Sequence, residues 1–409
     1  MTATTNSTAA GTPAAGTTTV DASRPALRAT PRAGVVLMSG YHSPQLEVKV
    51  RLNTNEAPEP PPTAWREEVR TAAASISFNR YPDREAHELR RRIGALHGVG
   101  VEQVHVANGS NEVLQSLLLA YGGHGRCVAV FEPTYALHSH IARLTGTAVV
   151  EGERDGDFLV PESGIGAVLE KARADHGPEN PVITFLCSPN NPTGRLEPRH
   201  TVERVLGEAP GLVVVDEAYG QFAPWSAVEL LRANPHLVVV RTFSKTWSLA
   251  GLRLGYAIGD PEVIDAMWRV TLPYHLDALK QAAGCAALDH DDDMRARVAR
   301  LAAERGRLVE RLRNLGAEVV PSDANFVLFR PPVPDSKAVW QGLVERSVLI
   351  RDVSSWPRLR GQLRITVGTP EEDDAFLDAL AEVMAPAPTT PAAAAAAEVS
   401  PSATAQAAS

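Results

Sequence analysis

The sequence predicts an α/β fold: a large domain with a mainly parallel seven-stranded sheet flanked by helices, followed by a smaller α+β C-terminal domain. Seven short runs rich in Val, Ile and Leu are apolar throughout, as strands buried on both faces of a parallel sheet are. Amphipathic segments separate these runs, and such alternation is typical of a sheet with helices on both faces. Near Asp260 the pattern changes, and a long charged helix and four further strand candidates follow.

The seven strands of the large sheet are expected at 104–108, 127–133, 147–153, 182–188, 212–219, 237–245 and 253–259. Apolar residues at helical spacing predict helices that include 113–121 and 228–231. The charged helix is expected at 294–315, with Gly316 as its C-terminal cap. The smaller domain then shows strands at 317–320 and 325–329, a helix at 339–345, strands at 348–351 and 363–367, and a last helix at 373–383.

Composition divides the 409 residues into five segments. Residues 1–35 and 386–409 are rich in Thr, Ala and Pro and bury too little apolar surface to offset the entropy of ordering, so we predict two disordered tails. Between the tails we expect an N-terminal arm at 36–80, a large domain at 81–290 and a small C-terminal domain at 291–385.

Charge and cysteine content exclude several classes of protein. The net charge of −8 argues against non-specific nucleic-acid binding, and no apolar run approaches the ~18 residues of a membrane-spanning helix. The three cysteines, Cys127, Cys187 and Cys285, are odd in number and widely spaced, which excludes a disulfide scaffold or a cysteine-rich zinc site. We therefore expect a cytoplasmic protein with no metal, no nucleic-acid partner and no membrane attachment.

Two polar segments follow expected strands and could bind a ligand. Gly109-Ser110-Asn111-Glu112 opens a helix, whose free N–H groups form a cradle suited to phosphate. The alternative is a plain helix cap at Ser110. The segment S-P-N-N-P-T-G at 188–194 forms a rigid turn that presents the amide of Asn191, unless it is an ordinary turn.

Asp216 ends a buried strand, and Tyr219 follows three residues later. A carboxylate in that position is costly unless it meets a cation. The alternatives are a structural Asp or a magnesium-binding Asp of a nucleotide triphosphatase. The latter needs a phosphate loop ending in Gly-Lys, and the chain contains no Gly-Lys pair.

Lys245 leaves another buried strand beside Ser244, with Arg253 in the turn that follows. Apolar surroundings depress a lysine pKa and make the amine nucleophilic, although a surface lysine is the usual alternative. Ser244 and Arg253 suit a phosphate. A reactive lysine, a buried carboxylate and a phosphate cradle together match the requirements of pyridoxal phosphate, with Asp216 as partner of the pyridinium nitrogen and Lys245 as the base that moves a proton.

The motifs N-P-T-G, D-E-A-Y and S-K followed by G-L-R-L-G-Y resemble those of the fold-type I pyridoxal-phosphate aminotransferases. R-Y-P-D, G-S-N-E, P-Y-H-L and R-I-T-V-G-T are similar to the histidinol-phosphate branch of that family. The resemblance covers about residues 51–384. It implies that the large domain binds the cofactor and that the N-terminal arm contributes to the active site.

The resemblance also implies roles for individual residues. Lys245 would bond covalently to the cofactor, Asp216 would pair with its pyridine nitrogen, and Asn191 and Tyr219 would contact its 3-hydroxyl oxygen. Tyr135 would stack on the ring. The cofactor phosphate would be held by Ser110, Asn111, Ser244, Arg253 and, across a homodimer interface, Tyr81.

Arg351, Arg364 and Asn55 would bind the substrate. A planar guanidinium matches both phosphate and carboxylate, so one arginine pair can serve histidinol phosphate in one half-reaction and glutamate in the other. The implied activity is transamination between histidinol phosphate plus 2-oxoglutarate and imidazole-acetol phosphate plus glutamate, in histidine biosynthesis.

Two departures from the family pattern keep other substrates open. Glu59 places a carboxylate where relatives close a ring over the substrate, and Trp247 stands where smaller or Phe-like residues are common. If Glu59 faces the pocket, it repels a phosphorylated substrate; if it points to water, it changes nothing. The alternatives are an aromatic or other amino-acid aminotransferase, a threonine-phosphate decarboxylase-like enzyme and a non-catalytic binding protein.

Overall fold

The computed structural model describes residues 29–36 and 44–385. Two compact units can be separated, residues 1–41 and residues 42–409. In the first unit the described element is the short helix α1 (Ala33–Val36). Every other element belongs to the second unit. The expected tails lie outside the described residues, apart from 29–35.

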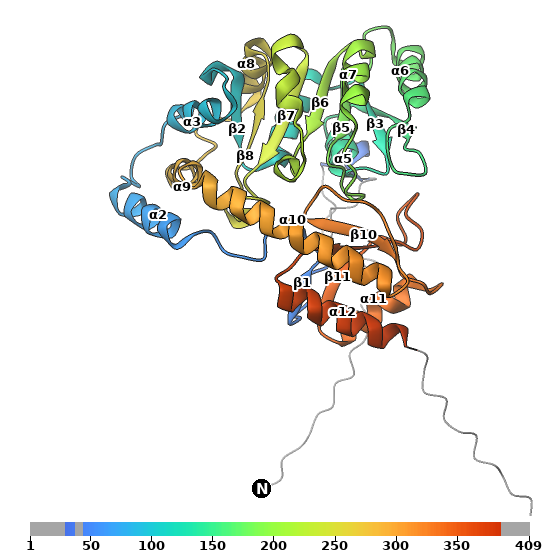
Figure 1. Cartoon of the computed structure of the whole chain (residues 1–409). Coiled ribbons are helices and arrows are strands. Elements are labelled where there is room, and N and C mark those ends of the chain that lie inside the picture. The colour runs from blue at the N-terminus through green and yellow to red at the C-terminus, as the bar shows by residue number, and fades with distance from the viewer. Residues whose placement is uncertain (1–28, 37–43, 386–409) are drawn as a thin grey trace, which may run out of the picture. The chain divides into compact units, whose positions relative to one another are not determined.

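The large sheet has the seven strands that the sequence predicts, in the order β2-β8-β7-β6-β5-β3-β4 (Figure 1). β8 is antiparallel to both of its neighbours, while the other adjacent pairs are parallel. Six strands therefore end at the same edge, where ligands bind in such sheets. The strands are β2 (Val104–Ala107), β3 (Cys127–Glu132), β4 (Ala148–Glu153), β5 (Ile183–Cys187), β6 (Leu212–Asp216), β7 (Leu237–Thr242) and β8 (Gly255–Ile258).

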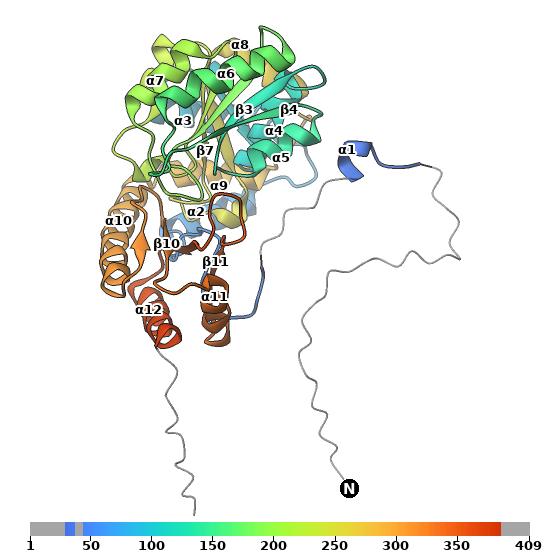
Figure 2. The ribbon, with the colours of Figure 1, turned by 90° about the vertical axis from the view of Figure 1, so that its right-hand side faces the viewer.

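Helices cover both faces of this sheet because alternate strand residues enter two different cores. Val213 and Val215 pack with α3 (His87–His97), α6 (Glu162–His176) and α7 (Arg199–Glu208). Leu212 and Val214 pack with α4 (Ser110–Tyr121), α5 (Leu137–Leu144) and α8 (Pro261–Val270) on the opposite face (Figure 2). This two-sided burial explains the continuous apolar strand pattern in the sequence.

A second sheet of five strands has the order β1-β11-β12-β10-β9. Its first strand comes from the N-terminal arm, since β1 (Val50–Leu52) pairs in parallel with β11 (Val348–Asp352). The other strands are β9 (Glu318–Val319), β10 (Phe326–Arg330) and β12 (Leu363–Thr366), and the helices are α11 (Ser336–Glu345) and α12 (Pro370–Met384). The arm thus completes the sheet of the expected small domain, although the domain boundaries stay predictions.

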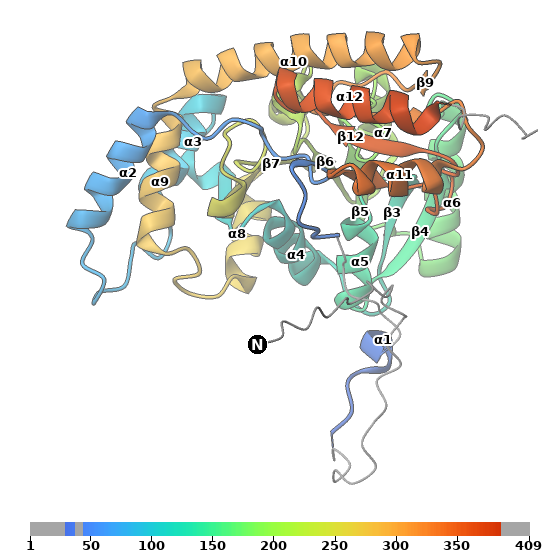
Figure 3. The same cartoon turned by 90° about the horizontal axis from the view of Figure 1, so that it is seen from below.

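The long helix α10 (Asp291–Asn314) runs from α9 (Ala278–Leu288) to the five-stranded sheet and lies along α12 (Figure 3). Gly316, with φ +82°, ends it as expected. The N–H groups of Gly316 and Ala317 bond to the carbonyls of Arg313 and Leu312 at 2.9 and 3.1 Å, which completes a Schellman cap.

Smaller elements connect these parts. The helix expected around 228–231 is instead a 3₁₀ helix, η3 (Ala227–Ala233), which follows a capping box at Ser226. The remaining elements are α2 (Thr63–Ser75), which packs on α9, and the 3₁₀ turns η1 (Val101–Gln103), η2 (Gly220–Phe222) and η4 (Ala250–Leu252). Within residues 29–36 and 44–385, no helix combines the length and apolarity that crossing a bilayer requires.

Candidate active site

Lys245 lies just beyond the end of β7, at the shared carboxyl edge of the large sheet. Its Nζ donates a hydrogen bond to the Thr54 carbonyl at 3.1 Å and lies 5.8 Å from the centre of the Tyr219 ring. Burial lowers the pKa of Lys245 to about 7, with a further contribution from the positive charge of Arg364. A large fraction of this amine is therefore neutral, and hence nucleophilic, at neutral pH.

Asp216 ends the adjacent strand β6 and is 1% exposed. Its Oδ1 accepts the Ala218 N–H at 3.1 Å, and its Oδ2 lies 3.0 Å from Nε2 of His138. His138 is fully buried on α5, with its ring stacked on Phe185 at 4.7 Å. These contacts fix a buried carboxylate in one orientation. His138 is not among the residues predicted from the sequence, because its partner Asp216 lies 78 residues further along the chain.

The expected phosphate cradle is assembled between the start of α4 and the turn after β7. The Arg253 guanidinium donates to Ser244 Oγ at 3.2 Å, and Tyr135 donates to Asn111 Oδ1 at 3.1 Å. Gly109, with φ +87°, precedes Ser110 at the start of α4, and a Cβ there would lie 2.7 Å from Arg253 Nη2. Five of the predicted phosphate and ring contacts thus surround one helix N-terminus: Ser110, Asn111, Tyr135, Ser244 and Arg253.

The N-terminal arm and the five-stranded sheet complete the site beside Tyr219. Asn55 donates to the Tyr219 hydroxyl at 2.9 Å, and burial raises the pKa of that hydroxyl. Arg364 donates to Asn191 Oδ1 at 2.6 Å and to the Asn53 carbonyl at 3.0 Å. Four distant segments of sequence, represented by Asn55, Asn191, Tyr219 and Arg364, therefore meet beside Lys245.

Arg351 and Arg364 are directly opposite each other on the antiparallel strands β11 and β12. Cross-strand partners share a face of a sheet, so both guanidinium groups lie on one side. Both side chains are buried. The expected substrate-binding pair is thus brought together, and Arg364 joins it directly to Asn191 in the turn at 188–194.

Tyr81 is placed differently from the other predicted residues. Its side chain is 80% exposed, and its ring stacks on Tyr274 with a centre-to-centre distance of 4.4 Å. Within this chain that contact does not bring Tyr81 to the cradle, and its predicted role on a neighbouring subunit stays a prediction.

The two departures from the family pattern, Glu59 and Trp247, make contacts with residues that are not among the predicted site residues. Glu59 accepts a hydrogen bond from Arg300 of α10 at 2.6 Å. Trp247 is buried in the core of the large sheet, where its ring centre lies 5.4 Å from that of Phe243. The expectation that these residues alter substrate choice therefore has no support from their contacts.

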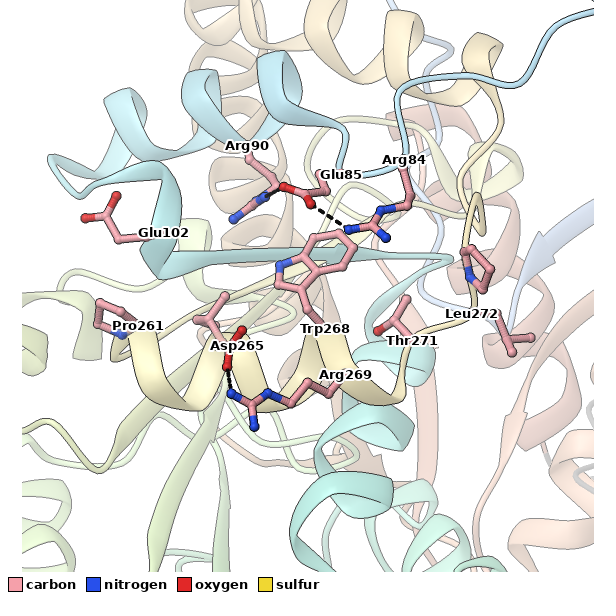
Figure 4. A pocket seen from close by; sticks show the side chains of 12 residues that line it. Arg84, Glu85, Arg90, Glu102, Pro261, Asp265, Trp268, Arg269, Thr271 and Leu272 are labelled. Atoms are coloured by element: carbon pink, nitrogen blue, oxygen red, sulfur yellow. Dashed lines mark hydrogen bonds and ion pairs between the residues drawn. The ribbon is translucent and has the colours of Figure 1, made fainter.

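A separate cavity of about 700 Å³ lies between α3 and α8 (Figure 4). The Arg90 guanidinium covers its central Trp268 at 4.9 Å. Its ion pairs include Arg84 with Glu85 and Arg269 with Asp265. None of the predicted site residues lines this cavity, and most of its charges pair with one another.

Comparison with known proteins identifies the family. The family model for aminotransferase class I and II matches residues 47–380. The chain therefore belongs to the class I and II aminotransferases, and the family prediction from the sequence motifs is confirmed.

Individual relatives agree with this assignment. The chain is 46% identical over 354 residues to a histidinol-phosphate aminotransferase of Corynebacterium glutamicum, covering 84% of this chain and 93% of that protein. It is 47% identical to the enzyme of the same name from Thermobifida fusca, covering 83% and 91%. A solved histidinol-phosphate aminotransferase from Sinorhizobium meliloti, in complex with pyridoxal-5'-phosphate, superposes with a TM-score of 0.78 at 24% identity, covering 87% and 98%, and confirms the predicted fold class.

Proposed function

We propose that this protein is a pyridoxal-phosphate-dependent transaminase that interconverts histidinol phosphate plus 2-oxoglutarate with imidazole-acetol phosphate plus glutamate. The observation that carries the proposal is the position of Arg364, which lies near the buried amine of Lys245 and directly opposite Arg351 on the neighbouring strand. The Corynebacterium and Thermobifida relatives, at 46% and 47% identity over most of the chain, support the same substrate.

The donor set of the site fits pyridoxal phosphate. Gly109 keeps the approach to the cradle free of a Cβ, and Arg253 with Ser244 supplies cationic and hydroxyl donors for a phosphate. The fixed carboxylate of Asp216 suits a protonated ring nitrogen, and the amine of Lys245 suits an aldehyde carbon. When bound, the cofactor supplies a heterocycle that stabilises negative charge developing on the substrate.

The chain's own residues bind and orient the substrate and move protons. Arg351 and Arg364 hold the anionic end of the substrate, phosphate in one half-reaction and carboxylate in the other. Lys245 takes and returns a proton at Nζ, for which a pKa of about 7 is well placed. Tyr219, whose hydroxyl is kept protonated and is oriented by Asn55, offers a hydrogen bond beside that amine.

The test is turnover by the purified protein. Histidinol phosphate plus 2-oxoglutarate should yield glutamate, and Lys245→Ala should abolish that yield. A donor panel that includes aromatic amino acids ranks the alternative amines. Release of carbon dioxide from threonine phosphate without a keto-acid acceptor would indicate the decarboxylase instead. If wild-type protein loaded with cofactor forms no glutamate, the proposal that histidinol phosphate is the substrate is refuted.

We also propose that the working form is a cytoplasmic homodimer. Phe78, Tyr81 and Leu272 are 73%, 80% and 77% exposed, and Tyr274 extends the same apolar group through its stack on Tyr81. A second copy would cover these side chains and receive Tyr81 at its cradle. Light scattering should give twice the mass of one chain, and Tyr81→Ala should weaken cofactor binding. A monomeric, fully active protein would contradict the dimer.

A further inference from the structure

The segment between β11 and β12, residues 353–362, forms a small ordered unit at the rim of the site. Val353 and Leu359 are buried in a cluster with Leu328 of β10. Trp356 packs against this cluster, and so does Phe158, which follows β4 of the large sheet. The segment is therefore anchored by apolar contacts to the five-stranded sheet, and through Phe158 the same cluster contacts the loop that follows β4.

Trp356 of this segment lies against one of the two substrate-binding arginines. The guanidinium carbon of Arg351 is 5.4 Å from the centre of the Trp356 ring. An aromatic face attracts a guanidinium and fixes its plane, while the N–H groups at the guanidinium edge stay available for a bidentate anion. Trp356 therefore restricts the orientations in which Arg351 can present its donors.

Two residues later, the segment is bonded to the large sheet. Arg358 donates from Nε and Nη2 to the two carboxylate oxygens of Glu153, both at 2.5 Å. Glu153 is the last residue of β4, and Glu151 on the same strand lies 3.7 Å from Arg358. A bidentate arginine–carboxylate pair is geometrically specific, so this contact orients the segment relative to β4.

We propose that residues 353–362 form a strap in which Trp356 and Arg358 are positioning residues for Arg351. Arg358 ties the strap to Glu153, and Trp356 transmits that position to the guanidinium that receives the anionic end of the substrate. The inference deepens the proposed function and rests on its role for Arg351. It predicts that the strap controls the apparent affinity for anionic substrates more than the rate of the chemical step.

The kinetic test compares Trp356→Ala with Trp356→Phe. Loss of the ring should raise KM for histidinol phosphate about 3- to 30-fold with kcat changed less than about twofold, whereas Phe should restore most of the affinity. Arg346→Ala is the matched control, since Arg346 forms an exposed pair with Glu382 at 2.9 Å in the same half of the molecule. A folded Trp356→Ala protein with the KM of the control would overturn the proposal.

Limited trypsin digestion tests the strap without any activity measurement. Arg358 and Arg360 are cleavage sites inside it, and Glu153→Ala should release them and speed cleavage there about tenfold or more over wild type. Glu382→Ala breaks a similar ion pair elsewhere and should leave that cleavage unchanged. Equal cleavage in wild type and Glu153→Ala would rule out the strap. If histidinol phosphate is not a substrate, KM is measured with the best donor from the panel, so the two proposals fail separately.

Discussion

Replacing His138 with Phe removes the donor that holds Asp216 while keeping a ring in the same buried position. The imidazole stacks on Phe185 at 4.7 Å with an interplanar angle of 4°, an arrangement that a phenyl ring can retain. The lost contact is the 3.0 Å hydrogen bond from Nε2 to the Asp216 carboxylate. A hydrogen bond to a charged group contributes about 1.5–3 kcal/mol. Nδ1 of His138 has no hydrogen-bond partner among the described residues, so Nε2 makes the only hydrogen bond that holds the ring there.

We therefore expect His138→Phe to lower the free energy of unfolding by about 1.5–3 kcal/mol. If the bond acts fully in the transition state, kcat falls by about 10- to 150-fold, at 1.36 kcal/mol per factor of ten. Urea denaturation at fixed cofactor concentration measures the first effect, and glutamate release measures the second. His138→Gln, which keeps a terminal N–H donor, should recover part of both losses. Wild-type kcat in His138→Phe, or an equal loss in His138→Gln, would refute the positioning role.

Three further predictions follow from local geometry. Gly109→Ala should weaken cofactor binding by about tenfold or more, because its Cβ would enter the cradle. Gly123 is also at positive φ but has open space around it, so Gly123→Ala should lower the free energy of unfolding without weakening cofactor binding. Burial raises the pKa of Asp373, so the free energy of unfolding should fall as the pH rises above 3.8, the ordinary pKa of an Asp side chain. Denaturation at several pH values measures this dependence, which should be weaker in Asp373→Asn. The apoenzyme should take up pyridoxal phosphate faster as pH rises through 7, and Arg364→Met, which removes a positive charge beside Lys245, should move that midpoint upward.

The large sheet was predictable because most of its strands are buried on both faces, and their sequences are therefore largely apolar. Leu212 to Val215 alternate between two cores, so each residue is apolar and the run stands out without knowledge of its neighbours. The end of α10 was predictable for a similar reason, since Gly316 is itself the left-handed cap. The segment 228–231 was predicted as an ordinary helix because its apolar spacing fits one, whereas over η3 (Ala227–Ala233) the chain forms the tighter 3₁₀ geometry.

What the sequence could not show are pairings between distant residues. His138 and Asp216 are 78 residues apart, and nothing local marks a helical His as the partner of a strand-end Asp. The ion pair of Glu59 with Arg300 spans 241 residues, so the sequence alone could not decide between a carboxylate that faces the substrate and one that points elsewhere. In the same way, β1 joins the sheet of the C-terminal region through its register with β11, which depends on the tertiary fold.

The electrostatics of the site link substrate binding to the chemistry of Lys245. The charges of Arg364 and Arg253 lower the pKa of Lys245, and both side chains are proposed to receive anions. An anion bound to either guanidinium offsets part of its positive charge and so raises the pKa of the Lys245 amine. Nζ is thus least basic, and most nucleophilic at neutral pH, while the arginines are free of anions. It becomes a better proton acceptor once phosphate and substrate are bound, when a proton must be moved. The two arginines proposed to receive the cofactor phosphate and the substrate therefore also adjust the basicity of the Lys245 amine.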